Sequence, residues 1–211
     1  MDFRKKLEAM VEGLRTNPRI QVLEAVLADP AAPAEIEQAK DLAKGSLPAG
    51  VEELYRQMNG FRLRWEHCFE RLTKHSDADR GFVNILPLLT VFGDWEGLTA
   101  PAGSAGGDEH RPVKPVDDFI PEACAAFYQE PGRAPRGTVY YHVYGKSLED
   151  TAHTFPEYLE RLLVSRGYFY WIQTLCPAHQ NDDAVKDFRH DMPLLFDDYD
   201  DELFHPKATG G

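Results

Sequence analysis

The 211-residue sequence predicts an α+β protein in which an antiparallel-rich sheet packs with helices. Phe61, Leu63 and Trp65 alternate with arginines, which is the period-two pattern of a half-buried strand. Thr154-Phe155-Pro156-Glu157 has the S/T-x-x-E pattern that opens a helix. The chain is 43% hydrophobic and carries 9 Tyr, 12 Phe and 3 Trp, which is enough apolar surface for a compact core.

The first 45 residues are predicted to form a helical extension. The apolar residues that recur there at helical spacing are Phe3, Leu7, Met10, Val11 and Leu14. A second helix is expected to start at Asn17-Pro18 and to turn Ile20, Leu23, Val26 and Leu27 inward, so that the chain opens as a helical hairpin. Residues 34–44 are expected to form a third, weaker helix.

The central residues, 46–177, are predicted to be the α+β domain. Ser46 can cap a helix that begins near Leu47-Pro48, and Asn59-Gly60 is expected to end it because glycine readily adopts the left-handed conformation. Further strands are expected at 82–86 and 138–144. The helix that Thr154 opens is expected to end at Gly167, and the PAGSAGG segment, 101–107, to be a flexible loop.

The last residues, 178–211, are predicted to be an acidic C-terminal tail. Nine acidic residues lie between positions 181 and 205, against Lys186 and Arg189. The apolar residues among them are Phe188, Leu194, Leu195, Phe196, Tyr199, Leu203 and Phe204. Burial of a side chain such as Leu195 contributes about 1.5–3 kcal/mol, so we expect the tail to pack on the domain.

The string LPAGVEELYRQMNGFRLRW, residues 47–65, resembles the signature of the SUKH superfamily, which includes the Smi/Knr cell-wall regulator of yeast and many bacterial immunity proteins. The family-motif residues are Leu47, Pro48, Leu54, Tyr55, Asn59, Gly60 and Trp65, then Trp95 in FGDWEG (92–97), and Phe155 and Leu159 in HTFPEYLERL (153–162). The resemblance covers about residues 47–170. It implies an α+β domain with an antiparallel-rich sheet, a mid-domain strand and turn at FGDWEG, and no catalytic residues.

The resemblance also implies a function in protein binding, because bacterial members are commonly immunity proteins that neutralise a toxin, often a nuclease or deaminase. The net charge of −12 suits a basic partner, since acidic side chains can occupy a cleft built for phosphates. We therefore expect a cytoplasmic immunity protein with a cognate protein toxin as its partner. The candidate partner-binding residues are Asp197, Asp198, Tyr199, Asp200, Asp201 and Glu202.

Other interpretations stay open. The acidic residues can equally form a solvated tail, and Tyr140, His142 and Tyr144 would offer an aromatic patch if their strand face were exposed. A regulatory interaction module of the Smi/Knr kind would use the same domain with the cell's own proteins. A small hydrolase would need an enclosed polar pocket with shifted titratable groups.

Charge and cysteine content argue against a nucleic-acid-binding protein, a membrane protein and a disulfide-rich protein. The negative net charge opposes binding to nucleic acid and to anionic membranes. Three widely spaced cysteines argue against a disulfide framework and favour a reducing cytoplasm, and no run of about 20 apolar residues is present to span a membrane.

We expect no catalytic residues, cofactor or metal. Cys176-x-x-His179 with His190 downstream is the nearest approach to metal-ligand spacing, and it is interpreted as a packed cysteine and an exposed histidine. Cys124 lies in the stretch EACAAFY, which is interpreted as helical and buried. Cys124 or Cys68 could be combined with His142 or His153 for nucleophilic catalysis, but three cysteines and eight histidines offer such combinations in any chain.

Overall fold

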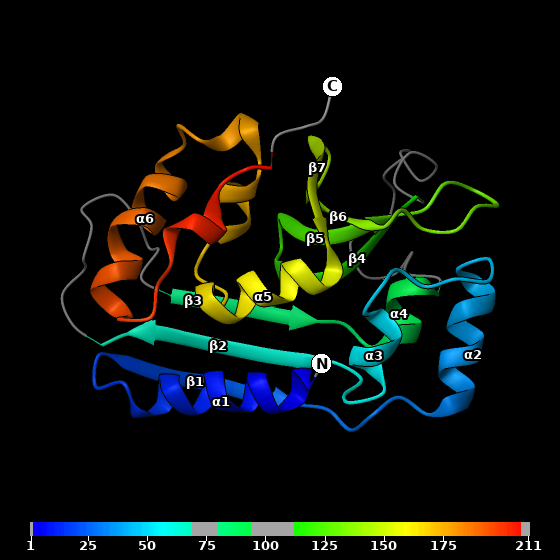
Figure 1. The fold of residues 1–211 in the computed structure, drawn as a ribbon, viewed down its shortest axis with the longest axis horizontal. Helices are drawn as coiled ribbons and strands as arrows, with labels where there is room; N and C mark the ends of the chain where they lie inside the picture. Colours follow the sequence, from blue (N-terminus) through cyan, green and yellow to red (C-terminus); the bar gives the residue numbers. More distant parts are fainter. Residues whose placement is uncertain (1, 69–79, 94–111, 208–211) are drawn as a thin grey trace.

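The computed structural model describes residues 2–68, 80–93 and 112–207 and has an α+β fold built on a seven-stranded antiparallel sheet (Figure 1). This confirms the predicted fold class. The strands follow chain order across the sheet: β1 (Ile20–Leu27), β2 (Phe61–His67), β3 (Arg80–Ile85), β4 (Val113–Ile120), β5 (Ala123–Tyr128), β6 (Thr138–Val143) and β7 (Ser147–Thr154). The helices are α1 (Phe3–Thr16), α2 (Pro33–Leu42), α3 (Val51–Tyr55), α4 (Leu88–Phe92), α5 (Phe155–Ser165) and α6 (Asp183–Leu195), with 3-10 turns η1 (Trp171–Leu175), η2 (Pro177–His179) and η3 (Asp201–Phe204).

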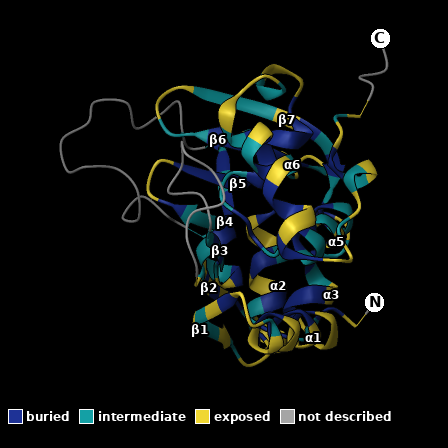
Figure 2. Cartoon of the chain, turned by 90° about the vertical axis from the view of Figure 1, so that its left-hand side faces the viewer, coloured by how far each residue is buried: buried dark blue, intermediate teal, exposed yellow. Residues whose placement is uncertain are grey.

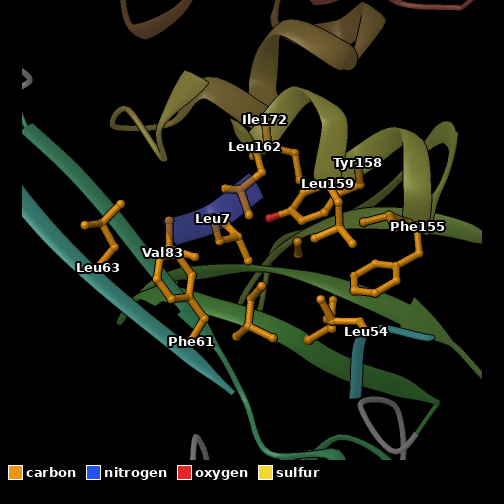
Figure 3. Close-up of a cluster of buried hydrophobic side chains, with 14 of the residues drawn as sticks. Leu7, Leu54, Phe61, Leu63, Val83, Phe155, Tyr158, Leu159, Leu162 and Ile172 are labelled. Carbon is orange, nitrogen blue, oxygen red and sulfur yellow. The ribbon is translucent and has the colours of Figure 1, made fainter. Parts of the chain in front are cut away.

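The helices lie on one side of the sheet, and we call the sheet surface that they cover the inner face (Figure 2). On β2 the predicted alternation is present, with Phe61, Leu63 and Trp65 buried and Arg62 and Arg64 exposed on the opposite, outer face. Side chains from α1 and α5 pack onto the inner face (Figure 3). One cluster of buried apolar side chains runs from the first helix to the last 3-10 turn, so all three predicted parts of the chain share a core.

The predicted second helix is wrong, because residues 20–27 form strand β1 at the edge of the sheet. The register against β2 shifts between Val22 and Glu24, which inserts Leu23 as an extra residue. Leu23 and Val26, expected to face inward, are 46% and 44% exposed. The bulge interrupts the alternation of the strand, and the apolar residues at helix-like spacing include two that face solvent.

Three further local predictions need correction. Helix α3 begins at Val51, after Gly50 in the left-handed conformation (φ 80°), and not at Leu47-Pro48. The stretch around Cys124 is strand β5, not a helix, although the cysteine is buried as expected. Phe92 ends helix α4, so FGDWEG does not start as a strand. Trp95 and the loop 101–107 lie outside the described residues.

Asn59-Gly60 connects α3 to β2 as predicted. Gly60 has φ 123°, and a Cβ there would lie 3.1 Å from the carbonyl oxygen of Ile85. The Asn59 Oδ1 atom accepts a hydrogen bond from the backbone N–H of Leu88 at 2.8 Å, at the start of α4. The pair thus fixes both the turn into β2 and the end of the neighbouring strand.

The sheet consists of two parts, β1–β3 and β4–β7. In the described chain a single register pair, Ile85 with Asp117, joins β3 to β4. The beginning of β3 pairs instead with the segment after α5, through Phe82 N–H to Gly167 O at 2.8 Å and Phe169 N–H to Arg80 O at 2.9 Å. We use the word seam for this edge of β3, where it meets both β4 and the segment after α5.

Helix α5 starts and ends where the sequence predicts. Glu157 Oε2 accepts hydrogen bonds from the backbone N–H and the hydroxyl of Thr154, both at 2.8 Å. Arg166 (φ 54°) and Gly167 (φ 68°) then adopt left-handed conformations that end the helix. Within the described residues, no helix is long and apolar enough to cross a membrane.

Candidate functional site

Residues 197–202, the acidic segment, follow α6 on the helical side of the sheet. Phe196, immediately before the segment, packs edge-on against Trp65 at 5.8 Å between ring centroids. Phe204, shortly after it, lies 4.8 Å from Phe188 of α6. Buried rings on both sides therefore hold the acidic segment against the domain.

Asp198 is anchored by Arg166 at the end of α5. The guanidinium Nη2 lies 2.6 and 2.7 Å from the two carboxylate oxygens and its Cζ lies 4.1 Å from the centroid of the Phe196 ring. The Arg166 side chain is only 11% exposed, whereas that of Asp198 is 69% exposed. Arg166 was not predicted from the sequence, because only the fold brings residues 32 positions apart together.

Tyr199 and Asp201 form an internal pair. The Tyr199 hydroxyl donates to Asp201 Oδ1 at 2.6 Å, and the ring stacks on Phe204 with centroids 5.6 Å apart. Burial, followed by this carboxylate, raises the pKa of Tyr199 well above its ordinary value. Asp201 also lies 3.2 Å from His205 and 3.8 Å from Arg189. These contacts fix the acidic segment and leave Tyr199 half-buried.

The outward carboxylates are Asp197, Asp200 and Glu202, all exposed. Asp200 Oδ1 accepts the backbone N–H of Glu202 at 3.2 Å, which caps η3. The six predicted partner-binding residues thus divide into two groups. Asp198, Tyr199 and Asp201 anchor the acidic segment, and the other three face solvent.

A surface hollow of about 390 Å³ lies beside the acidic segment. Its lining residues are Gly13, Asn17, Pro18, Arg19, Arg166, Leu195, Phe196, Asp197 and Asp198. Asn17 Nδ2 donates to Leu195 O at 3.0 Å, and Arg19 donates to Leu194 O. The residues just before β1 therefore help to position those that lead into the acidic segment.

Two further contacts hold the chain after the acidic segment, and no local sequence pattern predicts them. Arg161 Nε donates to Leu203 O at 2.8 Å, and Lys207 Nζ lies 2.7 Å from Glu157 Oε1. Burial alone would raise the pKa of Glu157, but Lys207 and the Thr154 donors outweigh it and lower that pKa to about 2. Both ends of the acidic segment are consequently tied to α5 or to α6.

The sulfur and imidazole candidates lie apart from this surface. Burial raises the pKa of the Cys124 thiol well above its ordinary value, which disfavours the nucleophilic thiolate. Burial lowers the pKa of His153 to about 4, and its Nδ1 donates to Thr151 O at 2.6 Å. Cys68 is exposed at the end of β2.

His179 corrects one expectation, since it is half-buried and not exposed. Its Nε2 lies 2.8 Å from Glu149 of β7 and its Nδ1 2.7 Å from Asp182 before α6. Cys176 is buried as expected. No group of three or more metal-ligating side chains occurs in the parts of the chain that the structure describes.

The strand face with Tyr140, His142 and Tyr144 does not form an exposed patch. Tyr140 and His142 are buried, and the Tyr144 hydroxyl donates to Asp118 Oδ1 at 2.8 Å. At the seam, Asp117 is also buried and receives the Tyr158 hydroxyl at 2.8 Å and the Asn84 N–H at 2.7 Å. Burial, partly offset by these donors, raises the pKa of Asp117 to about 7.

The described family-motif residues occupy structural positions. Leu54, Tyr55, Trp65, Phe155 and Leu159 are buried in the core. The Tyr55 hydroxyl donates to Leu86 O at 2.6 Å and the Trp65 Nε1 to Arg166 O at 2.7 Å. A scan of protein-family models finds none that matches this chain, and a search of curated proteins finds no match either.

Proposed function

We propose that this protein is an immunity protein that binds a cognate, basic protein toxin in the cytoplasm through its acidic segment. The observation that carries the proposal is the arrangement of Asp197, Asp200 and Glu202, which face solvent from a segment fixed by Phe196, Phe204 and Arg166. Carboxylates held in place lose little conformational entropy when a partner binds.

Electrostatics support a basic partner. The chain has a net charge of −12, so its field attracts a cationic protein and opposes approach to phosphate backbones. A toxin that acts on nucleic acid carries a basic cleft, and outward carboxylates can occupy the positions of phosphates. Charges at the rim of such an interface mainly raise the association rate and reject wrong partners.

The test is a binding experiment with a purified candidate effector, sought first among the proteins encoded by neighbouring genes. We compare the wild-type protein with Asp197→Asn/Glu202→Gln and with Glu160→Gln, a control that removes one negative charge at an exposed position on α5. The double variant is expected to associate about tenfold more slowly, while the control matches the wild type. High salt should reduce the difference between the proteins.

Protection of cells that express the effector gives the functional readout. Loss of protection by the double variant, together with slower binding, supports the immunity function. If the protein forms stable complexes with the cell's own proteins and none with the effector, the regulatory module replaces the immunity function as the proposal. An effector complex that is insensitive to both substitutions would move the interface away from the acidic segment.

A further inference from the structure

The outer face of β1–β3 carries a second exposed surface, which we call the arginine face: Leu23, Val26, Arg64, Arg80, Phe82 and Phe169. Arg64 and Phe82 are register partners on β2 and β3, and Arg62 lies beside them opposite Asn84. Phe169 reaches this surface because its backbone N–H bonds to Arg80 O across the seam. The helices lie on the other side of the sheet (Figure 2).

Aromatic rings support two of the guanidinium groups. The Cζ atom of Arg80 lies 5.3 Å from the ring centroid of Phe82 and 4.9 Å from that of Phe169, and the Cζ atom of Arg64 lies 5.8 Å from that of Phe82. The two rings contact each other at 6.2 Å. Stacking of this kind limits the motion of arginine while its N–H donors stay available.

The acidic residues that the structure describes near these two arginines form no ion pair with them. Glu24 forms its ion pair with Arg62, at 3.1 Å. Glu66 is the register partner of Arg80, but within the described ranges no carboxylate oxygen lies within 4.0 Å of a nitrogen of Arg64 or Arg80. The arginine face therefore offers cationic donors in a chain whose net charge is strongly negative.

Exposed apolar side chains accompany both charged surfaces. Leu23 and Val26 lie on β1 at the arginine face, and Leu194, 46% exposed, lies just before the acidic segment. Among the described residues these are the three most exposed large hydrophobic side chains. Each surface thus combines charges of one sign with aliphatic groups, a composition that suits a protein contact.

We propose that the acidic segment of one copy of this protein docks on the arginine face of a second copy. The two surfaces cannot meet within one molecule. Phe196, next to the acidic segment, packs on Trp65 of the inner face, whereas Arg64 points to the outer face. A contact between two different surfaces repeats from copy to copy, so it produces a ring or a chain of molecules.

Self-association through these surfaces engages the outward carboxylates Asp197 and Glu202. A basic partner that binds the same carboxylates therefore competes with the second copy. An acidic segment that is bound to the basic partner cannot also bind the arginine face. The self-association itself does not depend on the proposed toxin, because purified protein alone is enough to detect it.

The test is sedimentation equilibrium of the full chain at concentrations up to about 1 mM, where weak contacts become populated. The average mass of the wild-type protein is expected to rise above the monomer with concentration. Arg64→Glu/Arg80→Glu and Asp197→Lys/Glu202→Lys should each stay monomeric. An equimolar mixture of these two variants should associate again, because the first retains the acidic segment and the second retains the arginine face.

Lys146→Glu and Glu160→Lys are the controls, each with one charge reversal at an exposed position, and they should associate like the wild type. Circular dichroism checks the fold of each variant, and Arg64→Glu alone replaces the double variant if Arg80→Glu unfolds it. A wild-type protein that is monomeric throughout overturns the proposal. So does an association that the two charge reversals leave unchanged, or one that their mixture does not restore.

Discussion

Two groups of carboxylates in this protein have opposite surroundings. Asp117 at the seam and Asp191 on α6 are buried, and each accepts a tyrosine hydroxyl, from Tyr158 at 2.8 Å and from Tyr168 at 2.6 Å. Asp197 and Glu202 in the acidic segment are exposed. The first group accepts hydrogen bonds from buried tyrosine hydroxyls, and the second group is available to a partner. Burial makes the difference, because a carboxylate in the interior needs a donor from the protein, here a tyrosine hydroxyl, whereas water can solvate an exposed one.

The largest expected effect comes from removing the aromatic support. Phe188→Ala should lower the free energy of unfolding by about 3–5 kcal/mol, because the ring is fully buried and contacts Tyr168, Tyr199 and Phe204. Urea unfolding measures the change. Leu194→Ala, at an exposed position of the same helix, should change it by less than about 0.5 kcal/mol. Equal effects would mean that α6 does not pack as described.

The second effect is a dependence of stability on pH that the buried carboxylate Asp117 causes. With a pKa of about 7 in the folded protein and about 4 when unfolded, Asp117 takes up a proton on folding between these pH values. Stability therefore falls as pH rises from about 4 and levels off above about 7, a loss on the order of 4 kcal/mol at most. Asp117→Asn should match the wild type near pH 4 and exceed it at pH 8.

Urea unfolding at pH 4.5 and pH 8 tests this difference, with Asp197→Asn as the exposed control. The control should follow the wild-type pH profile. Parallel profiles for Asp117→Asn and the wild type would show that Asp117 ionises equally easily in the folded and unfolded chain.

A smaller effect is expected at the anchor of the acidic segment. Arg166→Ala removes the ion pair with Asp198 and the stacking on Phe196, and it should cost about 1–2 kcal/mol. Asp198→Asn keeps the stacking and should cost less, since this carboxylate is largely exposed. Thermal unfolding ranks the two variants. A larger loss for Asp198→Asn would contradict the dominant role of Arg166.

The smallest effect concerns His179. Burial would lower its pKa, but the hydrogen bonds with Asp182 and Glu149 outweigh burial and raise it. A raised imidazole pKa stabilises the fold fully below the unfolded value of about 6.5, and this contribution is lost as pH rises through the folded pKa. His179→Gln should therefore lower the melting temperature more at pH 5.5 than at pH 8, whereas equal losses would show that the pairing is independent of charge.

Regular periodicity made part of the fold predictable. Strand β2 and helix α5 follow their patterns because one face of each is buried and the other is not. β1 was misread because the extra residue Leu23 interrupts its alternation. The stretch around Cys124 was predicted as helical because five consecutive buried residues, 123–127, give no alternation, and alanine favours helices when isolated from tertiary contacts.

The candidate site was predictable in composition but not in geometry. The acidic residues and the apolar residues among them are visible in the sequence, and Leu195, Phe196 and Phe204 are buried. Which carboxylates face outward depends on Arg166 and Arg189. Their partners, Asp198 and Asp201, are distant from them in the sequence. The arginine face was not foreseen, because stacking of Arg80 on Phe169 requires the chain to return across the seam.

The seam has a consequence for local unfolding. Among the described residues, a single register pair joins β3 to β4, so the two parts of the sheet can separate there at a lower free-energy cost than within either part. Backbone amides at Leu86 and Phe169, whose hydrogen bonds cross the seam, should exchange with solvent deuterium faster than those inside β2 or β6. The protein would then open as two cooperative units, with Asp117 as the first buried carboxyl that water reaches.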